Sequence, residues 1–178
     1  SGSGKNAFIC AQVVGAEGRV IGVDRNSEML SLSRGAAAEV AEAIGYANVL
    51  FLEGAIEALD EQTSDATPLV PDASVDVVLS NCVLNLVNPV SRQRLLSNIR
   101  RVLAPGGRVA ISDIVCDRSV PLELQQDPEL WSGCISGAWQ EQEFLADFQD
   151  LGFEQVRYAD RSEEPWRVVE GIEFRAVT

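Results

Sequence analysis

The residues of this chain best suited to chemistry are its four cysteines, Cys10, Cys82, Cys116 and Cys134. No two of them form a Cys-x-x-Cys pair, and 178 residues are enough to bury a core without disulfides. The chain contains no histidine. This absence excludes Ser-His-Asp and Cys-His nucleophilic catalysis, histidine-containing zinc sites and a histidine general base. Any chemistry must therefore use thiols, carboxylates, hydroxyls or a bound cofactor.

The charge balance limits the partners. With 14 basic and 27 acidic residues the net charge is −13, which repels nucleic acids and anionic membrane surfaces. We find no secretory signal pattern at the start and no apolar run near the ~20 residues that span a bilayer. We therefore expect a reduced, cytoplasmic protein, a monomer rather than an oligomer, with no nucleic-acid or membrane partner.

A glycine-rich turn, Gly2-Ser3-Gly4, opens a helical pattern, and Asp24 ends the apolar run that follows it. Glycines let the backbone approach a ligand closely, and a carboxylate at a strand end can bind two ribose hydroxyls. Two cofactors fit this pattern: a dinucleotide, held by its pyrophosphate at the helix N-terminus, or S-adenosylmethionine, which has no phosphate. A cloning linker has the same SGSG composition, but a linker would not lie in register with Asp24.

Short β-branched runs alternate with helical patterns along most of the chain. We predict strands at 19–23, 48–52, 75–80 and 108–115, helices at 27–43, 89–103 and 140–151, a further strand at 154–158, and an alternating apolar run at 172–177. Asn88 and Pro89 provide an N-cap and a first-turn proline for the second helix. The residues that this helix should bury are Leu95, Leu96, Ile99, Val102 and Leu103.

This alternation predicts an α/β fold with a doubly wound, mostly parallel sheet. Its length fits a single domain, in which residues 1–117 form the cofactor-binding core and residues 118–178 supply a substrate-side segment and C-terminal strands. The glycine-rich turn should follow a strand, and the last run stops at Thr178 without a turn. We therefore expect a piece of a longer polypeptide, truncated at both ends and lacking the first strand of the sheet.

Two segments decide between the cofactors. The runs LAPGGRVAISD (103–113) and VDVVLSN (75–81) resemble the fifth and fourth strands of class I S-adenosylmethionine-dependent methyltransferases, with the turn before the fifth. Together with the glycine-rich turn and Asp24, they stand in the order of that superfamily. The resemblance implies the Rossmann-like methyltransferase fold.

Within that superfamily the chain resembles the arsenite methyltransferases over essentially its whole length. The segments that carry the resemblance are FLEGAIEAL (51–59), SNCVLNLV (80–87), SDIVCDRSVP (112–121), DPELWSGCISGA (127–138) and GIEFRAVT (171–178). SNCVxNL and LWxxCxxGA are the more specific, since other methyltransferases have no reason to place cysteines there.

The resemblance implies a role for each matching residue. On the donor side, the residues that would contact S-adenosylmethionine are Gly2, Ser3, Gly4, Asp24, Met29, Ile56, Glu57 and Asn81. Cys82 and Cys134 match the two thiols that bind arsenic, the substrate. Trivalent arsenic is soft and prefers thiolates, and once bound it keeps a lone pair that can attack the methyl group without a general base. A thiol reductant would be the further partner.

One departure concerns the number of thiols. Many members have a further cysteine where this chain has Ala7; Cys10, one turn later, either substitutes for it or packs as a small apolar residue. Cys116 matches none of the arsenic-binding thiols and is expected to be structural. It stays a minor candidate for the arsenic site, because it lies at the end of the predicted strand at 108–115. With two matching thiols, we expect an already methylated arsenical to be preferred over arsenite. The alternatives are methylation of another small molecule, arsenical binding without catalysis, and a nicotinamide-dependent oxidoreductase.

Overall fold

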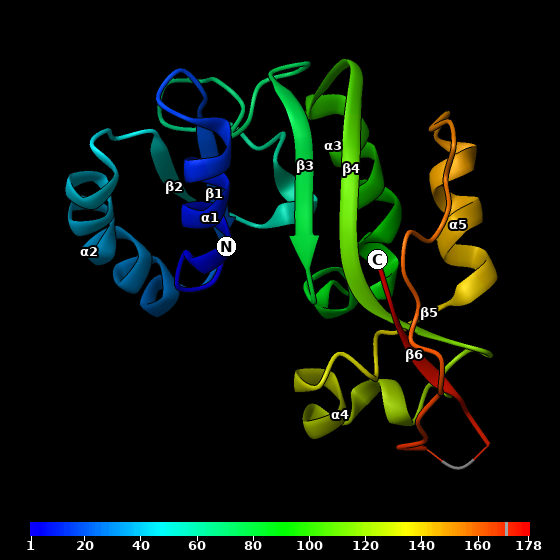
Figure 1. Ribbon diagram of the computed structural model, residues 1–178. Coiled ribbons are helices and arrows are strands. Elements are labelled where there is room, and N and C mark those ends of the chain that lie inside the picture. Colours follow the sequence, from blue (N-terminus) through cyan, green and yellow to red (C-terminus); the bar gives the residue numbers. More distant parts are fainter. Residues whose placement is uncertain (170) are drawn as a thin grey trace. The chain divides into compact units, whose positions relative to one another are not determined.

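The computed structural model describes residues 1–169 and 171–178 (Figure 1). The chain divides into two compact units, Ser1–Pro71 and Asp72–Thr178. Each unit combines helices with a sheet that contains parallel strands, so the predicted α/β class is confirmed. The division into residues 1–117 and 118–178 stays a prediction.

Unit 1 is built around one pair of parallel strands. Its elements are α1 (Lys5–Val14), β1 (Val20–Asp24), α2 (Ser27–Ile44), β2 (Val49–Glu53) and the 3-10 turn η1 (Ile56–Ala58). The register places Asp24 opposite Glu53, at the carboxyl end of both strands. Ala7 of α1 and Leu30 of α2 pack with Phe51 of β2, so both helices contribute to one core.

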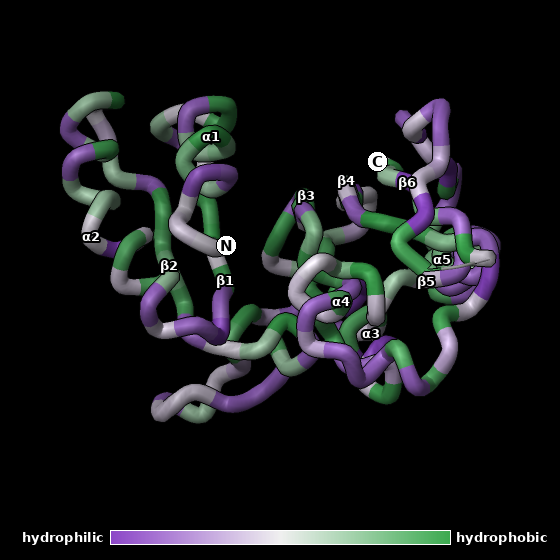
Figure 2. The backbone as a smooth tube through the Cα atoms, turned by 90° about the horizontal axis from the view of Figure 1, so that it is seen from below, coloured by the Kyte–Doolittle hydropathy of each residue, from purple (hydrophilic) through white to green (hydrophobic). Residues whose placement is uncertain are grey.

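Helix α2 follows from local signals in the sequence. Asn26 caps it, because its Oδ1 accepts hydrogen bonds from the backbone N–H groups of Glu28 and Met29 at 2.9 and 3.2 Å. Gly45 ends it in the left-handed conformation that favours glycine. Green and purple bands alternate along α2 in Figure 2, as expected of a helix with one apolar face.

Unit 2 is organised by its long central strand. Its elements are β3 (Val75–Asn81), η2 (Leu84–Leu86), η3 (Pro89–Ser91), α3 (Arg92–Val102), β4 (Leu103–Cys116), η4 (Leu124–Gln126), α4 (Pro128–Ser132), β5 (Trp139–Gln140), α5 (Glu141–Asp150) and β6 (Phe174–Val177). Strand β4 pairs in parallel with β3 and β5 and antiparallel with β6. The carboxyl ends of β3 and β4 therefore share one edge of this sheet.

The predicted core of α3 is confirmed. The buried residues of the helix are Leu95, Leu96, Ile99 and Val102. Leu103 is also buried, but it begins β4 rather than ending α3. Asn88 accepts the Val90 N–H at 3.1 Å, as a cap should, and η3 precedes the helix. Val77 and Leu79 of β3 are about half exposed. Side chains alternate along a strand, so these two share one face, and that face of β3 is only partly covered.

The predicted strand at 154–158 is wrong. These residues form bends and irregular backbone, and Gln155 has a φ of 58°. A left-handed residue interrupts the extended backbone that a strand needs. Tyr158 instead donates a hydrogen bond to the Glu141 carbonyl at 2.8 Å and stacks on Phe144, so the segment is fastened to α5.

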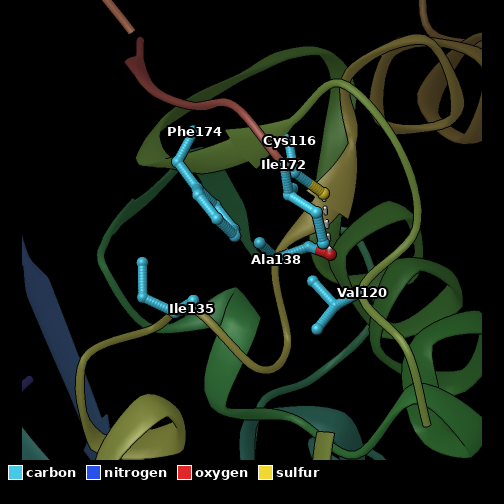
Figure 3. Packing of buried hydrophobic residues seen from close by; sticks show 6 residues of the cluster. All are labelled: Cys116, Val120, Ile135, Ala138, Ile172 and Phe174. Carbon is cyan, nitrogen blue, oxygen red and sulfur yellow. Dashed lines mark hydrogen bonds between the residues drawn. The ribbon is translucent and has the colours of Figure 1, made fainter. Parts of the chain in front are cut away.

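A second hydrophobic cluster joins the end of β4 to β6 and to the segment that precedes β5 (Figure 3). Its members are Cys116, Val120, Ile135, Ala138, Ile172 and Phe174.

None of the helices in the described ranges is long and apolar enough to cross a lipid bilayer.

Substitution of Phe174, which has no exposed surface, tests this cluster. Phe174→Ala should lower the free energy of unfolding by about 3–5 kcal/mol, because it removes a fully buried ring and leaves a cavity. Denaturant titration followed by circular dichroism measures the loss. The exposed Leu122, changed to Ala, is the control and should change stability by less than ~0.5 kcal/mol. Equal losses in the two variants would contradict the assigned core.

Candidate active site

The carboxyl edge of the β1–β2 pair gathers most of the predicted donor-binding residues. Asp24 ends β1, and the Gly54 N–H donates to its backbone carbonyl at 3.0 Å, which fixes the chain as it leaves β2. Turn η1, which contains Ile56 and Glu57, follows at once. Parallel pairing therefore brings Asp24 and η1 to the same edge of the sheet.

The Asp24 carboxylate is held by backbone donors. Its Oδ2 accepts the Gly2 N–H at 2.7 Å, and its Oδ1 accepts the Asn26 N–H at 2.9 Å. Burial raises the pKa of Asp24, but the hydrogen bonds from Asn26, the amino group of Ser1 and Gly2 outweigh it, so the pKa lies below its ordinary value. Asp24 is therefore ionised at neutral pH.

The glycines of the turn serve different purposes. Gly2 has a φ of 55°, and a Cβ there would meet no atom within 4 Å. Gly4 has a φ of 92° and begins α1; a Cβ there would lie 2.7 Å from the Phe8 ring and 3.0 Å from the Phe51 ring. Gly4 is therefore required by packing and by backbone conformation, whereas Gly2 borders open space.

The remaining donor-side residues are distributed over both units. Ser3 is exposed, and Met29 is half-buried in the first turn of α2. Asn81 ends β3 in unit 2, opposite Ser112 of β4, and is exposed.

The edge of unit 1 fits the ribose of an adenosyl cofactor. A carboxylate has about four lone-pair sites, and three N–H donors approach Asp24, so capacity for a ribose hydroxyl remains. The open space at Gly2 lies beside this carboxylate, since the Gly2 N–H donates to it.

Unit 2 brings two cysteines together from distant positions in the sequence. Cys82 directly follows β3, and Cys134 follows α4, 52 residues later. The Cys134 Sγ lies 3.5 Å from the Cys82 carbonyl oxygen, to which the thiol donates. Cys82 is exposed and Cys134 is buried.

Both cysteines have left-handed backbone conformations, with φ of 52° at Cys82 and 62° at Cys134. Three other non-glycine residues of the described chain share this feature, Ala66, Ala73 and Gln155. Such conformations are uncommon outside glycine and concentrate at functional sites. Glycine would satisfy the backbone at either position, so the thiols are retained at a cost in stability.

The surroundings of the two thiols keep them protonated. Burial, and then the nearby Asp113 carboxylate, raise the pKa of Cys82. Burial raises the pKa of Cys134 to about 11, with smaller contributions from Asp113 and Cys82. Both therefore carry S–H groups at neutral pH.

Asp113 fastens the chain that follows Cys82. Its carboxylate is buried and accepts the Leu84 N–H at 3.0 Å and the Ile114 N–H at 2.9 Å. Burial raises the pKa of Asp113, although backbone hydrogen bonds oppose the shift. The Cys82 N–H donates to the Ser112 carbonyl at 2.8 Å, so β4 holds Cys82 and the turn after it.

The other two cysteines lie in different surroundings. Cys116 is buried in the cluster of Figure 3, and its thiol donates to the carbonyls of Ala138 and Trp139 at 3.6 and 3.3 Å. Burial, the largest cause, raises the pKa of Cys116 to about 12, which agrees with a structural role. Cys10 is half-buried on α1. In the described part of the chain no three His, Cys, Asp or Glu side chains form a metal-binding cluster.

Sequence reasoning missed three residues around the thiols: Asn85, Asp113 and Gly137. Asp113 follows the mostly apolar run RVAIS and interrupts the apolar pattern inside the predicted strand, and a carboxylate at such a position was the available signal. Asn85 is an amide within the apolar run VLNLV. Gly137 gave no signal, because its need for glycine comes from a tertiary contact.

Comparison with known proteins shows the family to which the chain belongs. A family profile described as "Methyltransferase domain" matches residues 1–152. An arsenite methyltransferase from Halobacterium salinarum is 42% identical over 164 residues, which cover 92% of this chain and 38% of that protein. One from Aquipseudomonas alcaligenes is 41% identical over 148 residues, 82% of this chain and 40% of that protein. The chain thus spans about two fifths of the length of these curated relatives.

A solved structure is also similar. The crystal structure of CrArsM, an arsenic (III) S-adenosylmethionine methyltransferase from Chlamydomonas reinhardtii, matches with a TM-score of 0.82 and 33% sequence identity. The match covers 99% of this chain and 59% of that one.

The cost of the left-handed backbone at Cys82 can be measured with two substitutions. Cys82→Gly should be more stable than Cys82→Ala by about 1 kcal/mol, because alanine keeps the Cβ that disfavours this conformation. Denaturant unfolding measures both variants. Cys10, within helix α1, is the matched control and should show the reverse order, since glycine destabilises a helix. If Cys82→Ala were as stable as Cys82→Gly, the left-handed backbone at this position would have no cost in free energy of unfolding.

The raised pKa of Cys134 predicts how its alkylation depends on pH. The thiolate is the nucleophile, so its rate with iodoacetamide should rise about tenfold per pH unit from pH 7 and level off only near pH 11. Mass spectrometry of the peptide that contains Cys134 gives the rate. In denatured protein the same peptide should level off near the ordinary thiol value of 9.0. A plateau near 9 in the folded protein would show that burial does not act on this thiol.

Proposed function

Because the chain belongs to the methyltransferase domain family, we propose that the protein transfers a methyl group from S-adenosylmethionine to a trivalent arsenical bound by Cys82 and Cys134. The observation that carries the proposal is the contact of the Cys134 thiol with the Cys82 carbonyl oxygen at 3.5 Å, which brings together two cysteines in left-handed backbone, 52 residues apart in the sequence. The similarity to arsenite methyltransferases and to CrArsM supports it.

The proposed role of the thiols follows from their chemistry. Trivalent arsenic is soft and prefers sulfur to oxygen or nitrogen ligands. Each thiol would replace one hydroxyl on arsenic, and its S–H proton would leave with that hydroxyl as water. A high pKa does not hinder this exchange, because the proton is consumed in it. The raised pKa values of Cys82 and Cys134 are thus compatible with the site.

The transfer itself needs little acid–base help. S-adenosylmethionine supplies an electrophilic methyl group when bound. The lone pair on thiol-bound arsenic would form the new As–C bond while the bond from the methyl group to the donor sulfur breaks, and that electron pair would leave on S-adenosylhomocysteine. Arsenic would thereby become pentavalent, and the thiol reductant would return it to the trivalent state. No residue has to remove a proton, in agreement with a chain that contains no histidine. The protein would contribute proximity and alignment, worth ~7–11 kcal/mol at the extreme. Asp24 would hold the ribose, and the resemblance to the family assigns further contacts with the donor to Gly2, Ser3, Gly4, Met29, Ile56, Glu57 and Asn81.

Two thiols also set the proposed substrate preference. A methylated trivalent arsenical has two hydroxyls to exchange, which Cys82 and Cys134 would satisfy, whereas arsenite has three. We therefore propose methylarsenite as the preferred substrate. The protein would act as a monomer with a thiol reductant in a reducing cytoplasm, where free cysteines persist.

Replacement of Cys134 tests the assignment. Cys134→Ser should lower arsenic methylation by at least about 100-fold, because the second sulfur ligand that orients arsenic is lost. Its affinity for S-adenosylmethionine, measured by calorimetry, should be unchanged. Asp24→Asn should give the complementary result, with donor affinity lowered about tenfold or more, since it weakens a charged hydrogen bond to the ribose.

Cys10→Ser is the comparison at a second cysteine. It should keep full activity if Cys10 packs as a small apolar residue, and lose activity if Cys10 replaces the thiol absent at Ala7. A Cys134→Ser variant with wild-type arsenic methylation would contradict the thiol assignment. If the protein binds the arsenical but not the donor, it sequesters arsenic without catalysis; if it binds the donor but no arsenical, it methylates another small molecule.

A further inference from the structure

The two thiol-bearing segments are joined by one buried side chain. Asn85 lies in η2, three residues after Cys82, and is 1% exposed. Its Nδ2 donates to the Cys134 carbonyl at 3.1 Å and to the Ile114 carbonyl at 2.7 Å. One amide therefore ties the segment of Cys134 and strand β4 to the turn that begins at Cys82.

The backbones of the two segments are also in direct contact. A Cβ at Gly137 would lie 1.8 Å from the Asn85 carbonyl oxygen, so any side chain there would push the segments apart. Arg92 holds the far end of the same segment. Its Nη2 donates to the Gly137 carbonyl at 2.7 Å, and its guanidinium lies over the Trp139 ring, 4.3 Å from the centroid.

On the other side, Asp113 fixes the turn itself. The Leu84 N–H, next to Asn85, donates to its carboxylate at 3.0 Å. Asp113 thus holds the turn after Cys82 against β4. Asn85, in the same turn, donates a hydrogen bond to the Cys134 carbonyl and so connects this turn with the segment of Cys134.

The amide is unusual in one respect. The Oδ1 of Asn85 is buried and has no hydrogen-bond partner in the described part of the chain. A buried carbonyl oxygen without a donor is unfavourable, and an apolar side chain of similar size would avoid that cost. Such a replacement would, however, lose the two hydrogen bonds that the Asn85 Nδ2 donates.

We infer that Asn85 is a positioning residue that sets the spacing of the Cys82 and Cys134 thiols, so that one arsenic atom can bind both. The inference rests on the proposed function, because only a two-thiol ligand benefits from that spacing. When the first thiol has bound, a correctly placed second thiol acts at a high effective concentration. Loss of the spacing should therefore weaken two-thiol binding and leave single-thiol reactions unchanged.

Two probes separate these effects. Phenylarsine oxide, a trivalent arsenical, binds two thiols, whereas iodoacetamide alkylates one. In Asn85→Leu the Kd for phenylarsine oxide should rise about tenfold or more, because the second thiol is no longer held where its effective concentration toward the first is high. The alkylation rate of the exposed Cys82 should stay within about twofold. The KM for methylarsenite should rise while the KM for S-adenosylmethionine stays the same.

The matched control is Asn98→Leu. Asn98 is also a buried asparagine of unit 2, but it lies on α3, where its amide donates to the Arg94 carbonyl. Its replacement should lower Tm without changing the Kd for phenylarsine oxide. Asn85→Ser, which is smaller and also lacks the two amide bonds, provides the same comparison if the leucine variant does not fold.

The outcomes distinguish this inference from the proposed function. If the wild-type protein methylates arsenic and folded Asn85 variants bind phenylarsine oxide with unchanged Kd, positioning by Asn85 is wrong and the function stands. If the wild-type protein binds phenylarsine oxide without methyl transfer and the variants lose affinity, positioning stands and the function fails. A wild-type protein that does not bind phenylarsine oxide overturns both.

Discussion

The two hydrogen bonds of the Asn85 amide join parts of the chain that are 29 and 49 residues away in sequence. Through them the turn after β3, the strand β4 and the segment of Cys134 keep one arrangement. The close approach of Gly137 to the Asn85 carbonyl and the bond from Leu84 to Asp113 depend on the same arrangement. The Cys134 thiol lies against the Cys82 carbonyl because these backbones are held together.

The surroundings of Cys82 and Cys134 combine several features that lower the stability of the fold. Cys82 and Cys134 occupy left-handed backbone, which disfavours every residue but glycine, and Asn85 buries a carbonyl oxygen without a donor. Burial and the Asp113 carboxylate also raise the pKa of both thiols. Unfavourable features of this kind concentrate at functional sites, and here they gather around the two cysteines for which we propose arsenical binding.

The residues at the carboxyl edge of the β1–β2 pair are brought together for a different physical reason. Parallel strands must end at one edge of their sheet, so Asp24 and η1 become neighbours from the order of elements alone. This is why the sequence was enough to group them. The ends of α2, the cap at Asn88 and the apolar face of α3 were equally predictable, since each depends on residues within a turn or two. The strand expected at 154–158 failed because Gln155 adopts a left-handed conformation that no local signal marked.

The sequence by itself determined the α/β class, the helices and most strands, and it predicted which residues contact the donor and which two thiols bind arsenic. Those features depend on local propensity, on the order of elements or on resemblance to a family. Only the tertiary structure decided that Cys134 lies against Cys82, that both have left-handed backbone, and that Asn85, Asp113 and Gly137 surround them. These facts come from contacts between residues tens of positions apart, and neither periodicity nor spacing along the chain encodes such contacts.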